Sequence, residues 1–143
     1  MDSAAILPPV SDQQQNLEII RRSWAAWMER DMDRAAADWD PEIVWDITRH
    51  EDAPDTVHHG IAEVMEMIAN WMLAFRAYEL IIERFEPAGD NVLLLLRRRA
   101  RDAGSGETAD RFAAHVWTVR DGKVVLIRSY SDIAEARREA GLG

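Results

Sequence analysis

The spacing of the apolar residues changes once along this chain, near residue 77, and that change limits the folds open to it. Before it, apolar side chains recur every three or four residues, as on one side of a helix. After it, they alternate with polar residues, as along strands with one buried face. A chain of 143 residues suits one domain with one core. We therefore expect an α+β domain in which helices cover a sheet.

Three helical segments are expected in the first half of the chain. Ser11 and Gln14 have the spacing of a capping box, which predicts a helix start after two prolines. The apolar stripe of this first helix consists of Leu17, Ile20, Trp24, Trp27 and Met28. A short second helix is expected over residues 31–39. The third follows Gly60, and its stripe consists of Ile61, Val64, Ile68, Trp71, Met72 and Phe75.

Five segments rich in β-branched and aromatic residues are predicted strands: 42–48, 78–86, 92–101, 108–120 and 123–130. The last four form an antiparallel meander, whose final turn, Asp121-Gly122, is a strong hairpin signal. Residues 49–59 are expected to be a loop, and a short capped helix follows residue 131. Residues 1–10 are expected to be a flexible tail, and residues 11–143 a single domain.

Composition and motifs exclude several classes of protein. A net charge of −9 opposes nucleic-acid binding and docking on an anionic membrane. The chain has no cysteine, no long apolar segment and no basic leader, so we expect a cytoplasmic protein without disulfides. No phosphate-binding, zinc-protease or serine-hydrolase motif occurs, so we expect no cofactor. The His and Asp residues of segment 50–59 match no metal-ligand spacing, and no metal is expected.

Three stretches carry a resemblance to a known family. They are DWDPEIVWDITRHEDAPDTVHHGIAEV (38–64), AAHVWTVRDGKVVLIRSY (113–130) and YSDIAEARREAGL (130–142). With the order of elements, they resemble the NTF2-like superfamily, and within it the SnoaL-like domains. The resemblance covers about residues 12–142. It implies a cone, in which a strongly bent, mixed but mainly antiparallel sheet wraps three N-terminal helices and a short C-terminal helix follows.

The same resemblance bears on catalysis, because enzymes of this superfamily place acid and base groups on positions of the sheet and of the first helix that face the cone. Counted from the hairpin turn, those positions fall on residues that lack such groups: Ala114, Ser129, Ser23 and Ile47. A register shift of one residue replaces them by His115, Tyr130, Trp24 and Asp46. A one-residue slip turns a strand's side chains to the other face, so both registers stay open.

Three residues are candidates for proton transfer. Asp46 is the only carboxylate within the apolar segment from Ile43 to Ile47, and burial would suit it to act as a general base or acid. Alternation also allows it to face solvent while Trp45 and Ile47 fill the core. His115 can transfer protons near neutral pH if it is buried, or it can lie on the outer face. Tyr130 is a candidate donor to an oxyanion.

A ligand site is expected where the apolar stripes converge at the mouth of the cone. Its flat, apolar wall is expected to consist of Trp24, Trp27, Trp45, Trp71 and Phe75. His58 is expected at the mouth, and Arg98 is a candidate clamp for a carboxylate or enolate. Alternation places the neighbouring arginines on the other face, where Glu79 and Glu83 can pair with them.

These features predict a SnoaL-like small-molecule protein. The first hypothesis is a cofactor-independent isomerase, cyclase or hydratase that moves a proton on a hydrophobic carbonyl substrate. The alternative is a non-catalytic dimeric module that binds an apolar ligand. If His115 and Trp117 point outward beside Leu93 and Leu95, they form an exposed patch, so a homodimer through this sheet face is expected.

Overall fold

The computed structural model describes residues 10–49, 56–74, 78–101 and 104–142, except the side chains of residues 10–12, 71–78 and 100–101. The helices are α1 (Val10–Met28), α2 (Met32–Ala35), α3 (Gly60–Ala74) and α4 (Ile133–Ala140). The strands are β1 (Trp39–Arg49), β2 (Val57–His59), β3 (Tyr78–Ala88), β4 (Asn91–Arg101), β5 (Thr108–Arg120) and β6 (Lys123–Tyr130). Most of the predicted tail lies outside the described residues.

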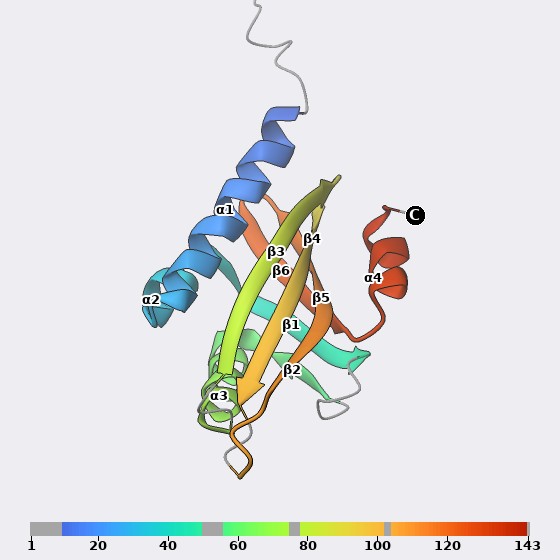
Figure 1. Cartoon of the computed structure of the whole chain (residues 1–143). Coiled ribbons are helices and arrows are strands. Elements are labelled where there is room, and N and C mark those ends of the chain that lie inside the picture. Colours follow the sequence, from blue (N-terminus) through green and yellow to red (C-terminus); the bar gives the residue numbers. More distant parts are fainter. Residues whose placement is uncertain (1–9, 50–55, 75–77, 102–103, 143) are drawn as a thin grey trace, which may run out of the picture.

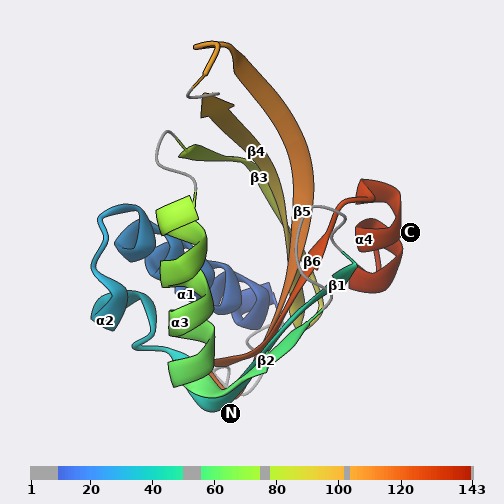
Figure 2. The ribbon, with the colours of Figure 1, turned by 90° about the horizontal axis from the view of Figure 1, so that it is seen from below.

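The strands form one curved sheet in the order β2-β1-β6-β5-β4-β3 (Figure 1). β1 runs parallel to β6, and the other neighbouring strands are antiparallel. Helices α1, α2 and α3 lie on the concave face of the sheet, and α4 lies on its convex face (Figure 2). The predicted α+β fold with a bent, mainly antiparallel sheet is therefore confirmed, and its helices occupy both faces of the sheet.

The hairpin between β5 and β6 has the predicted turn. Asp121 and Gly122 have positive φ values of 51° and 76°, as a two-residue turn of this kind requires. Asp tolerates this left-handed conformation better than most residues, and Gly adopts it without steric cost.

One extra residue in β6 changes the pairing beyond this turn. Val119 pairs with Val124, but the next pair is Thr118 with Leu126, so Val125 is a bulge without its own partner. As a result, His115 lies opposite Ser129. Without the bulge, Ala114 would have paired with Ser129 instead.

The bulge changes the facing of the later β6 side chains, whereas the side chains of β5 alternate without interruption past it. Trp117 belongs to the core on the concave face, and its strand neighbour Val116 belongs to a second, smaller core beneath α4. His115 lies on the same face as Trp117, because it is two residues away on the strand. The patch of outward-facing His115 and Trp117 is therefore wrong, and Leu93 is covered by α4. The homodimer itself stays a prediction.

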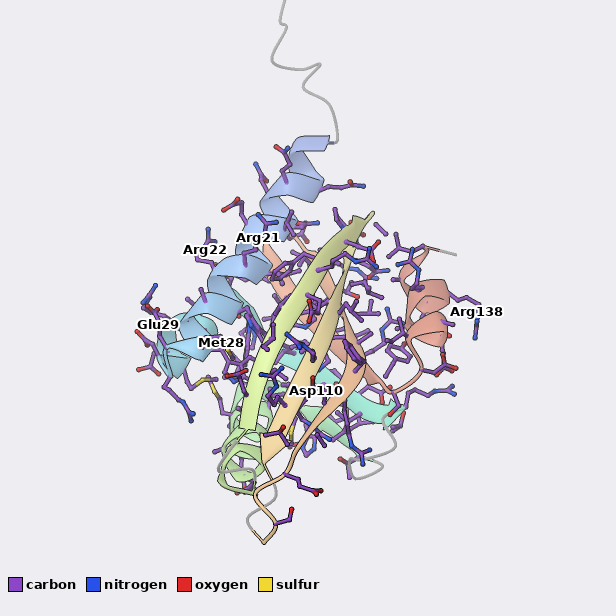
Figure 3. All side chains as sticks on the ribbon, in the orientation of Figure 1. Arg21, Arg22, Met28, Glu29, Asp110 and Arg138 are labelled. Atoms are coloured by element: carbon purple, nitrogen blue, oxygen red, sulfur yellow. The ribbon has the colours of Figure 1, made fainter. Side chains whose placement is uncertain are left out.

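The concave core confirms most of the predicted helix stripes. Ile20, Trp24 and Trp27 of α1 are buried, as are Val64 and Ile68 of α3. Burying each such side chain contributes about 1.5–3 kcal/mol. Met28 is an exception, with 42% of its surface exposed beside Glu29 at the end of α1 (Figure 3). The helix stops there, and Arg30 turns the chain with a φ of 63°.

Two local predictions are wrong. The second helix is only four residues long, because Asp31 caps its start and turn hydrogen bonds replace the helix after Ala36. Trp39, predicted inside that helix, begins β1 and is held by a hydrogen bond from its indole Nε1 to Ser23 Oγ at 3.0 Å. The predicted loop at 49–59 contains β2, which pairs with β1 at the edge of the sheet.

The C-terminal helix has the predicted caps. Asp132 accepts a hydrogen bond from the Glu135 backbone N–H, and Gly141 ends the helix with a φ of 92°. Its buried residues, Ala136 and Ala140, pack over Tyr130 on the convex face. None of the helices in the described part of the chain combines the length and apolar character needed to cross a membrane.

The burial of Tyr130 beneath α4 predicts a loss of stability at alkaline pH. Burial raises the pKa of Tyr130 above its ordinary value of 10.0, so the folded state favours the neutral phenol. This contribution is complete below pH 10.0 and is lost as the pH rises through the higher pKa of the folded state. Denaturant unfolding on both sides of that pH should show the decline in wild type.

The Tyr130→Phe variant should not show this part of the decline, because it lacks the ionisable hydroxyl. The only other tyrosine is Tyr78, so Tyr78→Phe is the matched control and should keep the wild-type pH dependence. An identical alkaline decline in wild type and Tyr130→Phe would contradict the placement of Tyr130.

Candidate active site on the concave face

A cluster of tryptophans forms the centre of the concave face. Trp24 and Trp27 come from α1, Trp45 from β1 and Trp117 from β5, and all four are buried. The ring centroids of Trp24 and Trp27 are 4.9 Å apart, and those of Trp27 and Trp45 are 5.6 Å apart. Trp24 meets Trp117 edge to face at 6.4 Å. The predicted convergence of Trp24, Trp27 and Trp45 is thus observed.

His115 lies within this cluster. Only 3% of its surface is exposed, and its ring centroid lies 5.6 Å from that of Trp45 and 6.4 Å from that of Trp24. The indole Nε1 of Trp117 donates a long hydrogen bond, 3.4 Å, to His115 Nδ1. An Nδ1 that accepts a hydrogen bond carries no proton, so this contact favours the neutral ring protonated on Nε2.

Ser129 lies opposite His115 on β6 and accepts a hydrogen bond of 2.8 Å from Trp45 Nε1. Ser23 accepts the corresponding bond from Trp39. The buried polar side chains of the described residues are Ser23, His115, Thr118 and Ser129. Three of these four therefore serve as acceptors for indole N–H groups. His115 differs from the two serines because its ring has a second nitrogen, which can carry a proton.

The other two candidates for proton transfer lie on the convex face. Asp46 is half-buried, and its Oδ1 accepts hydrogen bonds from the backbone N–H and hydroxyl of Thr48 at 2.9 and 2.6 Å. Tyr130 lies beneath α4. The structure therefore does not bring Asp46, His115 and Tyr130 into one site. The reason is that alternation along β5 points His115 inward, the bulge in β6 points Tyr130 outward, and the inward Trp45 and Ile47 leave Asp46 on the opposite face of β1.

Two further predicted ligand contacts lie toward the edges of the concave face. His58 on β2 pairs directly with Trp45, so the two side chains share a face. Its Nε2 lies 3.1 Å from the hydroxyl of Thr56. Arg98 is half-buried, and its direct partner on β5 is Arg111, a residue that the sequence interpretation missed. Counting in steps of two from His115 along β5 would have found it.

The arginines on the convex face pair with acids, as alternation predicts. Arg97 lies 2.8 Å from Glu83, and Arg99 lies 3.0 Å from Asp110, which is labelled in Figure 3. The hydrogen bond from Arg99 holds the pKa of Asp110 below its ordinary value. The side chains of both pairs are partly exposed to solvent, so these ion pairs add little to the stability of the fold.

Some predicted site residues cannot be placed. The side chains of Trp71 and Phe75 lie outside the described residues, as do His50, Asp52 and Asp55. Among the residues that are described, no group of three or more His, Asp or Glu side chains could hold a metal ion.

Comparisons with known proteins agree with this fold. A family model described as a SnoaL-like domain matches residues 20–127. An NTF2-like protein of unknown function from Burkholderia pseudomallei has a TM-score of 0.70 and 26% identity, over 87% of this chain and 95% of that one. TerC, co-crystallised with polyporic acid, has a TM-score of 0.71 and 23% identity, over 89% of this chain and 98% of TerC.

A protein described as a putative SnoaL-like polyketide cyclase from Jannaschia sp. has a TM-score of 0.65 and 22% identity, over 91% of this chain and 94% of that one. Likenesses at 22% and 23% identity show a shared fold. No curated protein matches significantly.

The hydrogen bond between Trp45 and Ser129 predicts a measurable loss of stability in Ser129→Ala. The substitution leaves a buried indole N–H without its acceptor, which costs about 1–3 kcal/mol of unfolding free energy. The same substitution at Ser105, in an exposed turn, should change stability by no more than about 0.5 kcal/mol. Urea denaturation measures both, and equal stabilities for the two variants would contradict the contact.

Proposed function

Because this chain belongs to the SnoaL-like domain family, we propose that its concave face binds a flat, largely apolar carbonyl compound and that His115 handles a proton there. The observation that carries this proposal is a buried imidazole edge-on to Trp24 and Trp45. Indole rings offer a flat apolar wall, which suits aromatic ligands. The similar fold of TerC, which was co-crystallised with polyporic acid, supports a small-molecule role.

The hydrogen bond that His115 Nδ1 accepts indicates how its ring can act on such a ligand. With Nδ1 accepting from Trp117, the ring acts as a donor through Nε2. Donation to a carbonyl oxygen withdraws electron density from the carbonyl group and stabilises the charge that develops as a solvent water takes a proton from the neighbouring carbon. This is the oxyanion-stabilising half of the chemistry that an isomerase, cyclase or hydratase of the proposed kind needs, and it requires no cofactor.

A non-catalytic binding module is the second candidate, and the placement of Asp46 and Tyr130 favours it. Both lie on the convex face, and Ser129, one of the aligned positions that lack an acid or base group, lies opposite His115. Exchange of the α-hydrogens of β-tetralone in heavy water separates the two candidates. A catalyst should speed the exchange measured by NMR, and His115→Phe should abolish that effect, whereas a binding module should bind the ketone without exchange.

Binding of 9-fluorenone, a flat aromatic ketone, tests the proposal most simply. Its binding should quench tryptophan fluorescence at micromolar concentrations, and fluorene, which lacks the oxygen, should bind more weakly. Because His115→Phe removes the donor but keeps an aromatic ring, it should weaken fluorenone binding about fivefold to tenfold. It should also remove the preference for the ketone over the hydrocarbon.

Asp46→Asn is the matched control for this experiment, since it alters a polar group on the opposite face of the sheet. It should leave both affinities unchanged. Absence of any quenching in wild type would refute the proposed site. A preference for the ketone that persists in His115→Phe would refute the role of His115.

A further inference from the structure

Ser129 is a second buried polar side chain beside His115 on the concave face. The two residues pair directly across β5 and β6, so their side chains share a face and their Cβ atoms lie about 5 Å apart. Ile127, two residues before Ser129 on β6, belongs to the same concave core. Ser129 and His115 are each only 3% exposed. Both therefore lie on the side of the sheet that carries α1 and α3 (Figure 2).

The two buried serines of the described residues use their hydroxyl groups differently. Ser23 Oγ accepts a hydrogen bond from Trp39 Nε1 at 3.0 Å and donates its own proton to the Ala35 carbonyl at 2.6 Å. Ser129 Oγ accepts from Trp45 Nε1 at 2.8 Å, but none of the described residues accepts the proton of this hydroxyl. A serine hydroxyl is a donor as well as an acceptor. Ser129 therefore keeps a buried donor that a bound molecule can use.

The hydrogen bond from Trp45 fixes the position of this donor. Because the Ser129 oxygen is held on the indole nitrogen, its O–H group points away from that nitrogen and can turn only about the Cβ–Oγ bond. The ring of Trp45 also lies close to edge-on to His115, with the ring centroids 5.6 Å apart. The hydroxyl and the imidazole thus approach the same indole from two adjacent strands. A flat ligand on this indole would meet both groups along one of its edges.

We propose that Ser129 donates a hydrogen bond to a second oxygen of the ligand, next to the carbonyl oxygen that His115 binds. The inference rests on the proposed function, because the tryptophans and His115 hold the aromatic body and the first oxygen. A buried donor without an acceptor is costly, and a second carbonyl oxygen supplies the acceptor that Ser129 lacks. The site would therefore select a flat aromatic compound with two neighbouring carbonyl groups over the corresponding monoketone.

Acenaphthenequinone, acenaphthenone and acenaphthene test this proposal, because they share one flat ring skeleton and carry two, one and no carbonyl oxygens. Isothermal titration calorimetry at neutral pH measures their affinities. Wild type should bind the quinone about fivefold to tenfold more tightly than the ketone, as expected for one added hydrogen bond between neutral groups. Ser129→Ala should bind the quinone no more tightly than the ketone and leave the affinity for the ketone unchanged. Ser129→Thr keeps the hydroxyl and should keep the preference.

Ser23→Ala is the matched control, because it also removes a buried indole acceptor, but one whose proton is already bound by Ala35. It should lose stability and keep the preference for the quinone.

Equal affinities for quinone and ketone in wild type, or equal preferences in the two alanine variants, would overturn the role of Ser129. Tighter binding of the ketone than of the hydrocarbon would still support the proposed function in that case, whereas binding of none of the three compounds would overturn both proposals. If Ser129→Ala does not fold, Ser129→Cys takes its place, because a thiol has a similar shape and is a weak donor. The preference for the quinone should then fall, and an undiminished preference would contradict the proposal.

Discussion

The register between β5 and β6 decides which side chains of β6 join the buried tryptophans and His115 on the concave face of the sheet. The hairpin turn sets the first pairs, and the bulge at Val125 then shifts all later ones by a single residue. His115 lies among the tryptophans because β5 alternates without interruption from Val119 through Trp117. The extra residue in β6 puts Ser129 opposite the imidazole and sends Tyr130 to the core beneath α4.

The tryptophan cluster depends on the satisfaction of its polar atoms, one of which the register supplies with Ser129 as its acceptor. A buried indole N–H without a partner is costly, and Trp39, Trp45 and Trp117 each donate to a buried acceptor. A serine suffices for the first two. The third acceptor is a histidine, which adds a donor and a titratable group to an otherwise apolar wall. That difference is the physical basis for assigning His115 a role with a ligand.

Much of the fold could be predicted from local sequence signals. The turn at Asp121-Gly122, the caps of α4 and the stripe of Trp24 and Trp27 depend on neighbouring residues, and the structure confirms them. The short strand β2 was missed, because its stability comes from pairing with β1 rather than from its own composition.

The candidate site was less predictable. Trp24, Trp27 and Trp45 were identified, but the faces of Ser129 and Tyr130 depended on the bulge in β6. Val125 is β-branched like the residue before it, so nothing in the local sequence marks it as the extra residue. Asp46 was favoured because it interrupts an apolar strand, yet the same alternation that buries Trp45 places Asp46 on the convex face.

The surroundings of the His115 ring in the free protein test this account most directly. NMR of a sample with labelled histidine reports both the protonated ring nitrogen and the nearest protons. The account predicts a neutral ring protonated on Nε2, with Overhauser contacts to the indoles of Trp24 and Trp45. Contacts to Leu93 and Val116 instead would place His115 beneath α4 and contradict the account.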